Sequence, residues 1–156
     1  MTDDLVLERL DSALLALRRF ASPELARPRI SHAGADIELS TVLVVDAIAR
    51  SAPGEVSVRL VADSLQVAPS TASRLVERAV QAGMVVGKSS ENDPRRRVLH
   101  LTRDGRRLQR AALRHRTQRL AHATADWSRD DLAQFADLLD RFARTVHPFP
   151  SDRTDP

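Results

Sequence analysis

The segment from Ala68 to Gly83 holds the side chains that are best suited to recognising another molecule. At helical spacing its apolar residues gather on one side and its polar residues on the other. The polar side consists of Ser70, Thr71, Ser73, Arg74, Glu77, Arg78 and Gln81. Short hydroxyls at a helix start, followed by arginines, are suited to hydrogen bonding with base edges and phosphates in a major groove. A solvated surface is the commoner explanation of a polar helix face, so the interpretation depends on the neighbouring elements.

Two helices are predicted before this segment. The first begins with Ser40 as its N-cap and stops before Ser51, and it is apolar nearly all round, which indicates a core helix. Ser57 is the predicted N-cap of the next helix, which ends at Leu65 and is followed by the turn Gln66-Val67. Two short helices joined by a tight turn are the layout of a helix-turn-helix, in which the second helix enters the groove.

The residues after the segment change from helical to strand periodicity. Gly83 is placed to end the helix in a left-handed conformation, and residues 84–86 and 98–101 predict two strands around a turn-rich loop. Residues 54–56 could supply a third short strand. A hairpin directly after a helix-turn-helix is a wing, so the fold predicted here is a winged helix.

The predicted wing is rich in basic residues. They are Lys88, Arg95, Arg96 and Arg97. A charged turn is one explanation of the three consecutive arginines. We expect at least one of them to contact a phosphate or a minor groove, because the wing follows a recognition helix.

The two ends of the chain carry apolar stripes at helical spacing. Residues 5–20 and 128–146 each predict an amphipathic helix, and at the start of the second Ser128 and Asp131 resemble a capping box, with Asp in place of the usual Glu. The stripes consist of Leu7, Leu10, Leu14 and Leu17 in the first helix and of Leu132, Phe135, Leu139, Phe142 and Val146 in the second. Each stripe could pack on the protein's own core. Two of them exceed what one protomer needs, which favours a dimer built from both ends.

Three further segments complete the predicted organisation. Pro23 and Pro28 interrupt the first helix, and residues 27–36 are predicted to form a loop. Thr102 is a suitable N-cap for a long, arginine-rich helix. Residues 147–156 include three prolines and are predicted to be a disordered tail.

Length and composition favour one small helical protein. The 156 residues leave room for a single domain or for a small core with an oligomerisation element, and the aromatic residues are only Trp127 and four phenylalanines. The absence of cysteine excludes disulfides, thiolate nucleophiles and zinc fingers. The acidic N-terminus does not resemble a signal peptide, and no apolar run is long enough to span a bilayer. We therefore expect a cytoplasmic protein without membrane contact.

Motifs for catalysis, cofactors or metals are not apparent. The run from Gly83 to Ser89 has three residues between its glycines where a phosphate-binding loop needs four, and it opens a strand. His115 and His122 share a helix face but lie roughly 10 Å apart along it, too far to share one metal ion. We expect no cofactor and no metal, and an enzyme is improbable.

The order of these motifs resembles the MarR (multiple antibiotic resistance regulator) family of bacterial winged helix-turn-helix transcription regulators. The resemblance spans roughly residues 5–146. It rests on Val61-Ala62-x-x-Leu65-x-Val67, Pro69-Ser70-Thr71-x-Ser73-Arg74-Leu75-Val76-x-Arg78, Gly83-Met84-Val85, Asp93-x-Arg95 and Leu101-Thr102-x-x-Gly105. Each piece alone is weak, whereas their joint order and spacing are strong support.

The resemblance implies a homodimer that binds a pseudo-palindromic operator in double-stranded DNA. One MarR-like domain would fill residues 1–156, with dimerisation helices in 5–36 and 103–146, the winged helix in 37–102 and the tail in 147–156. Ser70, Thr71, Ser73 and Arg74 would face the major groove. Arg95 would reach the minor groove, with Asp93 bracing the wing. The family further implies a repressor that a small-molecule effector of unknown identity releases.

Three positions depart from the family pattern. Ala68 stands where a capping serine is common, which weakens the start of the recognition helix by about 1 kcal/mol. Leu43 replaces the usual glutamine, and Gly87 stands where the first wing strand commonly has an arginine. These departures bear on affinity and wing geometry. The alternative to DNA binding is a winged helix that serves only as a protein-interaction module.

Overall fold

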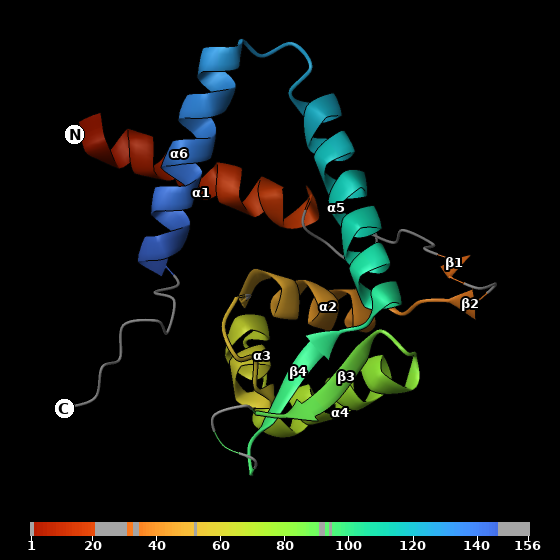
Figure 1. Cartoon of the computed structure of the whole chain (residues 1–156). Coiled ribbons are helices and arrows are strands. Elements are labelled where there is room, and N and C mark those ends of the chain that lie inside the picture. Colours follow the sequence, from red (N-terminus) through yellow and green to blue (C-terminus); the bar gives the residue numbers. More distant parts are fainter. Residues whose placement is uncertain are drawn as a thin grey trace. The chain divides into compact units, whose positions relative to one another are not determined.

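The computed structural model describes residues 2–20, 31–32, 35–51, 53–90, 93 and 95–146. These residues form two compact units, Met1–His115 and Arg116–Pro156. Figure 1 labels the helices and strands, which follow one another as α1 (Thr2–Phe20), β1 (Ser31–His32), β2 (Ala35–Asp36), α2 (Leu39–Ser51), α3 (Val58–Leu65), α4 (Pro69–Gln81), β3 (Val85–Ser89), β4 (Arg97–Leu101), α5 (Arg103–Ala123) and α6 (Arg129–Val146). The class is mainly α with a small β wing, as predicted.

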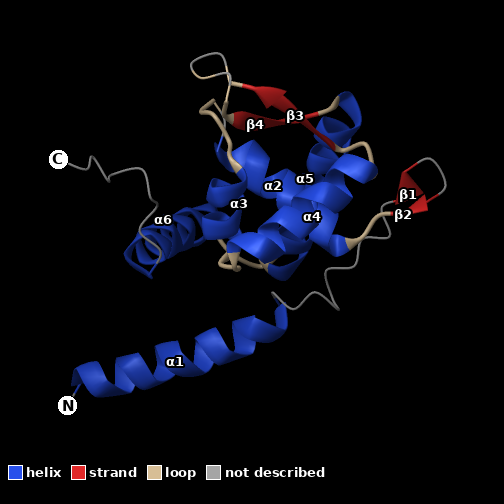
Figure 2. Cartoon of the chain, turned by 90° about the horizontal axis from the view of Figure 1, so that it is seen from below, coloured by secondary structure: helices blue, strands red, loops and turns tan. Residues whose placement is uncertain are grey.

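The centre of the first unit is a three-helix cluster with a β hairpin. Helices α2, α3 and α4 pack against one another, and the hairpin contacts the cluster through α2 with β4 and through α4 with β3. Figure 2 shows the two strands beside the three helices from below. This is the predicted winged helix.

The start of α2 differs from the prediction. The helix begins at Leu39, and the carbonyl oxygen of Glu38 accepts hydrogen bonds from the backbone N–H groups of Thr41 at 3.0 Å and Val42 at 3.4 Å. Ser40 is therefore inside the helix and is not its N-cap. Its hydroxyl donates instead to Oε2 of Glu38 at 3.0 Å. A serine near the start of a helix can either cap the helix or form a hydrogen bond with a neighbouring side chain. The presence of Ser40 alone therefore did not identify the first residue of α2.

The turn between α3 and α4 forms as predicted. Ser57 caps α3, because its Oγ accepts a hydrogen bond from the N–H of Leu60 at 3.2 Å. Gln66 ends the helix in the left-handed conformation with φ 54°. Ala68 occupies the N-cap position of α4 and makes no side-chain cap, while Pro69 begins the helix. Gly83, with φ +72°, ends the turn after α4 in the left-handed region that favours glycine.

The wing is a two-stranded antiparallel hairpin, and residues 54–56 beside it form only a rudimentary third strand, called here the rudimentary third edge. Val85 pairs with Leu101, and the register runs to Ser89 opposite Arg97. Both strands are longer than the predicted residues 84–86 and 98–101. The predicted strand at 54–56 is reduced to one ladder hydrogen bond, from the N–H of Leu99 to the carbonyl of Val56 at 2.8 Å.

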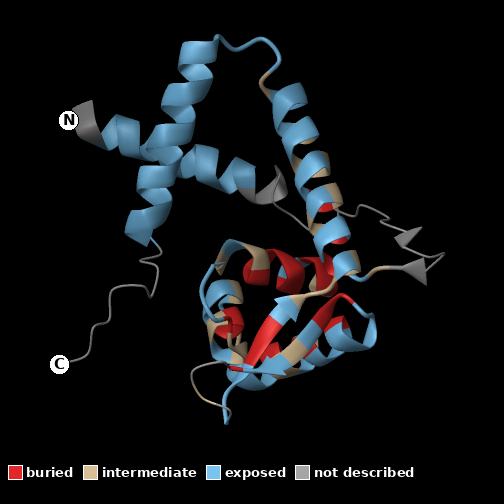
Figure 3. Ribbon diagram, in the orientation of Figure 1, coloured by how far each residue is buried: buried red, intermediate tan, exposed pale blue. Residues whose placement is uncertain are grey.

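One hydrophobic core holds the winged helix together. Side chains of α2, α3, α4, the wing strands and the first half of α5 meet in it, and Figure 3 shows these buried parts in red. Its fully buried large members are Val44, Val45, Val61 and Leu108. Burial of side chains this large contributes roughly 1.5–3 kcal/mol each. The nearly uniform burial of α2 agrees with its predicted role as the core helix.

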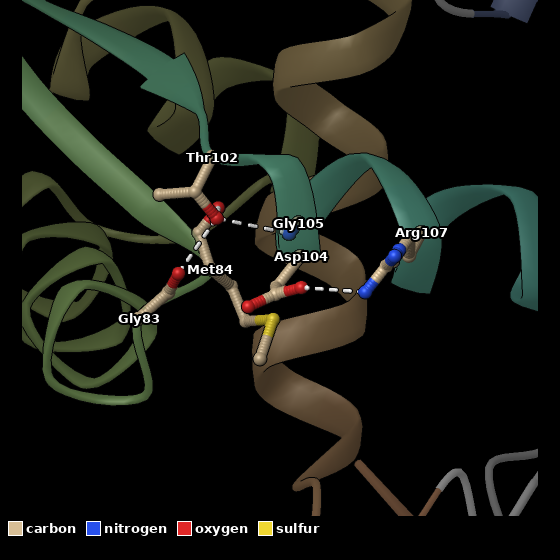
Figure 4. A network of polar contacts seen from close by, with 6 residues as sticks. All are labelled: Gly83, Met84, Thr102, Asp104, Gly105 and Arg107. Atoms are coloured by element: carbon tan, nitrogen blue, oxygen red, sulfur yellow. Dashed lines mark hydrogen bonds and ion pairs between the residues drawn. The ribbon is translucent and has the colours of Figure 1, made fainter. Parts of the chain in front are cut away.

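The junction between the wing and α5 is held by Thr102 and Gly105, which Figure 4 shows from close by. Oγ1 of Thr102 accepts a hydrogen bond from the N–H of Gly105 at 3.0 Å, which confirms the predicted N-cap, and donates to the carbonyl of Gly83 at 2.6 Å. A Cβ at Gly105 would lie 2.0 Å from the carbonyl oxygen of Met84. Only glycine allows the first turn of α5 to approach β3 this closely.

The second unit contains the end of α5, from Arg116 on, and α6. Ser128 caps α6 through a 3.1 Å hydrogen bond from the N–H of Asp131, and the Ser128 hydroxyl donates to the Asp131 carboxylate at 2.6 Å. The predicted capping pair is therefore present, with the carboxylate bonded to the hydroxyl. Trp127 packs edge to face on Phe135, with ring centroids 5.3 Å apart.

The remaining predictions concern the connections and the tail. Residues 27–36 were predicted to be a loop, but Ser31–His32 and Ala35–Asp36 pair as a short antiparallel hairpin. Two-residue strands are too short to produce a recognisable alternation. The prolines at 23 and 28 and the tail 147–156 lie outside the described residues.

Candidate nucleic-acid interface

The predicted recognition face lies on α4. Ser70, Thr71 and Arg74 are exposed, whereas Ala72, Val76 and Ala79 on the other side of the helix are buried in the core. The 3.6-residue period places these two sets on opposite faces, so burying the alanines and the valine presents the polar residues to solvent. The fold therefore brings three of the predicted groove contacts together on one open face.

Ser73 is less available than its neighbours. Its side chain is half-buried, and its hydroxyl donates to the carbonyl oxygen of Pro69 at 3.0 Å. The hydroxyl proton is thereby used within the helix, so Ser73 can offer a partner only acceptor lone pairs. Those suit a base amino group and do not suit a phosphate.

Arg78, at the far end of α4, contacts another helix. Its Nη1 lies 3.4 Å from Oε2 of Glu38, the residue directly before α2. Arg78 therefore forms an ion pair between α4 and the residue that precedes α2. Both side chains are more than half exposed, so the pair is weak and screened by salt.

The wing turn is braced by a chain of hydrogen bonds around Asp93. Its Oδ1 accepts a hydrogen bond from the N–H of Arg95 at 2.9 Å, and its own N–H donates to Oγ of Ser90 at 3.2 Å. Ser90 is buried, and its hydroxyl donates to Glu55, in the rudimentary third edge. These contacts connect the turn that carries Arg95 to the body of the winged helix.

The basic residues of the wing all face solvent. Lys88, Arg95, Arg96 and Arg97 are exposed. Arg97 lies across the neighbouring strand: a Cβ at Gly87 would be 3.4 Å from both its Nε and its Nη2. Gly87 thus leaves the room in which the guanidinium of Arg97 lies, so a positive charge occupies this part of the wing although position 87 has none.

Three residues of the interface region were missed by the sequence reasoning, namely Glu38, Glu55 and Ser90. Glu38 meets Arg78 across 40 positions and Ser90 meets Glu55 across 35. Isolated acidic and hydroxyl residues in loops carry no periodic signal. The turn-rich composition of residues 89–94 predicted the loop but not the hydrogen bond between Ser90 and Glu55 that holds it.

The apolar stripes of α1 and α6 are open to solvent in the single chain. Their nine residues are between 37 and 60% exposed. No residue of α6 is buried. A shallow depression of about 430 Å³ on the second unit is lined by Trp127, Phe135 and Leu138 together with polar residues, so it shares Phe135 with the stripe.

Two further features concern only the described part of the chain. No group of three or more histidine or acidic side chains is arranged there to hold a metal ion. No described helix is long and apolar enough to cross a membrane.

Comparisons with known proteins find relatives of this fold. Residues 35–96 match the model of the MarR family, a region that contains α2, the helix-turn-helix and the turn of the wing. No curated protein matches the chain.

Several solved structures share the fold over nearly their whole length. The structure of Streptococcus pneumoniae FabT in complex with DNA has a TM-score of 0.70 at 19% identity, covering 90% of this chain and 96% of that one. RV1404 from Mycobacterium tuberculosis has a TM-score of 0.69 at 20% identity, covering 94% and 97%. A MarR family protein from Bacillus stearothermophilus has a TM-score of 0.68 at 20% identity, covering 89% and 96%. The resemblance seen in the sequence is confirmed: residues 35–96 match the MarR family, and the chain shares its fold with these solved structures.

Proposed function

We propose that this protein is a sequence-specific DNA-binding transcription regulator. The supporting observation is the open polar face of α4, with Ser70, Thr71 and Arg74, next to a wing whose basic side chains are all exposed. Hydroxyls and a guanidinium on a helix of this position suit base edges, and wing cations suit phosphates or a narrow minor groove. The FabT structure has a similar fold and is a complex with DNA, which supports the same proposal.

The regulator acts as a homodimer on a pseudo-palindromic operator. The support is the pair of exposed apolar stripes on α1 and α6, which a soluble monomer would rarely leave open. In a symmetric dimer the two copies of α4 must stand about one DNA turn apart, near 34 Å, to enter successive major grooves. The dimer thus sets the spacing of the two half-sites.

We further propose a repressor that a small-molecule effector releases from DNA. The resemblance to the MarR family is the support for both points. An effector acts by changing the spacing of the two recognition helices, because groove entry on both half-sites tolerates little change in that distance.

Selection of bound sequences from random duplex DNA tests the function. Enrichment of an inverted repeat is the expected result, and it would establish DNA binding, symmetry and the operator together. A protein-interaction module without DNA affinity predicts no enrichment, and it predicts that Arg74→Ala and Arg95→Ala leave DNA retention unchanged. Repression is then measured by transcription from a promoter that carries the enriched sequence.

A further inference from the structure

Glu38 occupies a fixed position beside the recognition helix. Its carbonyl oxygen accepts the first hydrogen bonds of α2, from Thr41 and Val42, so its backbone moves with that helix. Helix α2 in turn packs on α4 through the common core. The Glu38 side chain is consequently held near the last turn of α4, where Arg78 is located.

The carboxylate of Glu38 is oriented by two donors. Its Oε2 accepts hydrogen bonds from the Ser40 hydroxyl at 3.0 Å and from Nη1 of Arg78 at 3.4 Å. The side chains of Arg78 and Glu38 are 56% and 65% exposed. An ion pair this exposed to solvent adds little to folding stability. Its main consequence is therefore its effect on Arg78.

Arg78 is one helical turn beyond Arg74 on the same side of α4. Its guanidinium is therefore within reach of the DNA that the α4 face would contact. A carboxylate at this place has two effects on a phosphate: it neutralises the cation that would bind it, and it repels the phosphate itself. Both effects weaken the attachment of any duplex, whatever its sequence.

We propose that Glu38 competes with the DNA phosphates for Arg78 and thereby limits sequence-independent DNA binding. The proposal rests on the proposed function. In free protein Arg78 pairs with Glu38; on DNA the guanidinium turns to a phosphate and the carboxylate is left to Ser40 and water. The affinity lost in this exchange falls equally on operator and random DNA, so it raises the share of binding that depends on base contacts.

The test measures binding of a random-sequence duplex and of the selected operator at several salt concentrations. Four proteins form a cycle: wild type, Glu38→Gln, Arg78→Ala and the double variant. Glutamine keeps the backbone bonds that start α2, so folding is preserved, and circular dichroism checks this. We expect Glu38→Gln to tighten binding of both duplexes about two- to fivefold, the size of an exposed ion pair. The salt slope should change little, because Arg78 contacts a phosphate in both complexes, whereas Arg78→Ala should lower it by about 0.9, one phosphate contact.

The controls separate the pair from its net charge. In the Arg78→Ala background Glu38→Gln should give a clearly smaller gain, because only the direct repulsion between the carboxylate and the phosphate is left. An equal gain in both backgrounds overturns the competition. Asp137→Asn, on the exposed surface of α6, changes the net charge equally and should leave affinity and slope unchanged. An unchanged or weaker affinity of Glu38→Gln, or an equal gain from Asp137→Asn, overturns the competition. If wild type binds neither duplex, the proposed function itself fails.

Discussion

Individual arginines of the interface have different surroundings, and these predict different tasks. Arg74 stands on the open face of α4, one helical turn after Ser70 and Thr71, where the proposed function places the base edges. Arg97 lies across Gly87 on the wing, an exposed cation on a strand, which suits a phosphate. The first should carry sequence information and the second should not.

The predicted difference appears in two alanine variants. Arg74→Ala should reduce operator binding by about 1–3 kcal/mol while random duplexes lose much less, because a base contact is removed. Arg97→Ala should weaken all duplexes alike and lower the salt slope by about 0.9. Fluorescence anisotropy on both duplexes over a salt series measures this. Equal losses on operator and random DNA for Arg74→Ala would contradict its reading role.

At the scale of elements, the junction between the wing and α5 depends on the absence of a side chain at Gly105. Gly105→Ala should destabilise the protein by about 3 kcal/mol, the upper end of the usual cost of overpacking, because the new Cβ meets the carbonyl of Met84 at 2.0 Å. Urea unfolding gives the free energy. Gly54→Ala is the matched control: its nearest atom, the carbonyl oxygen of Ser51, is at 3.4 Å, and its change should stay below about 1 kcal/mol. Similar losses for both would refute the close approach.

Helix α4 begins without a side-chain cap. Ala68→Ser should stabilise the protein by about 1 kcal/mol, since Ala68 has the extended ψ of 145° that lets a serine oxygen accept an N–H of the first turn. Thermal unfolding reports the gain. Ala82→Ser, at the C-cap of the same helix, offers no such acceptor role and should be neutral. No gain at position 68 would show that the first turn of α4 is already satisfied.

At the scale of the whole molecule, the apolar stripes of α1 and α6 determine the state of assembly. We expect light scattering at micromolar concentration to give about twice the 17.3 kDa mass of one chain. The double variant Leu10→Glu and Leu139→Glu should give the monomer mass, because burying two charges in an apolar interface is costly. Val80→Glu, on an exposed apolar residue of α4 outside both stripes, should keep the dimer. A monomeric wild type would rule out the palindromic operator.

The sequence by itself determined the elements and their limits wherever the signal is local. Ser57, Gly83 and Thr102 act on backbone groups within a few residues, so their roles were readable from neighbours alone. The alternation of buried and polar residues in α4 was readable for the same reason. Ser40 was misassigned because a local motif cannot tell capping from bonding to Glu38.

Only the tertiary structure decided which of these residues meet. Glu38 with Arg78, Ser90 with Glu55, and Gly105 with Met84 join residues that are 21 to 40 positions apart. Contacts at such separations depend on how helices pack on one another, and packing follows from the shape of the whole core. For that reason the exposed polar face of α4 was visible in the sequence, whereas the carboxylate that pairs with its last arginine was not.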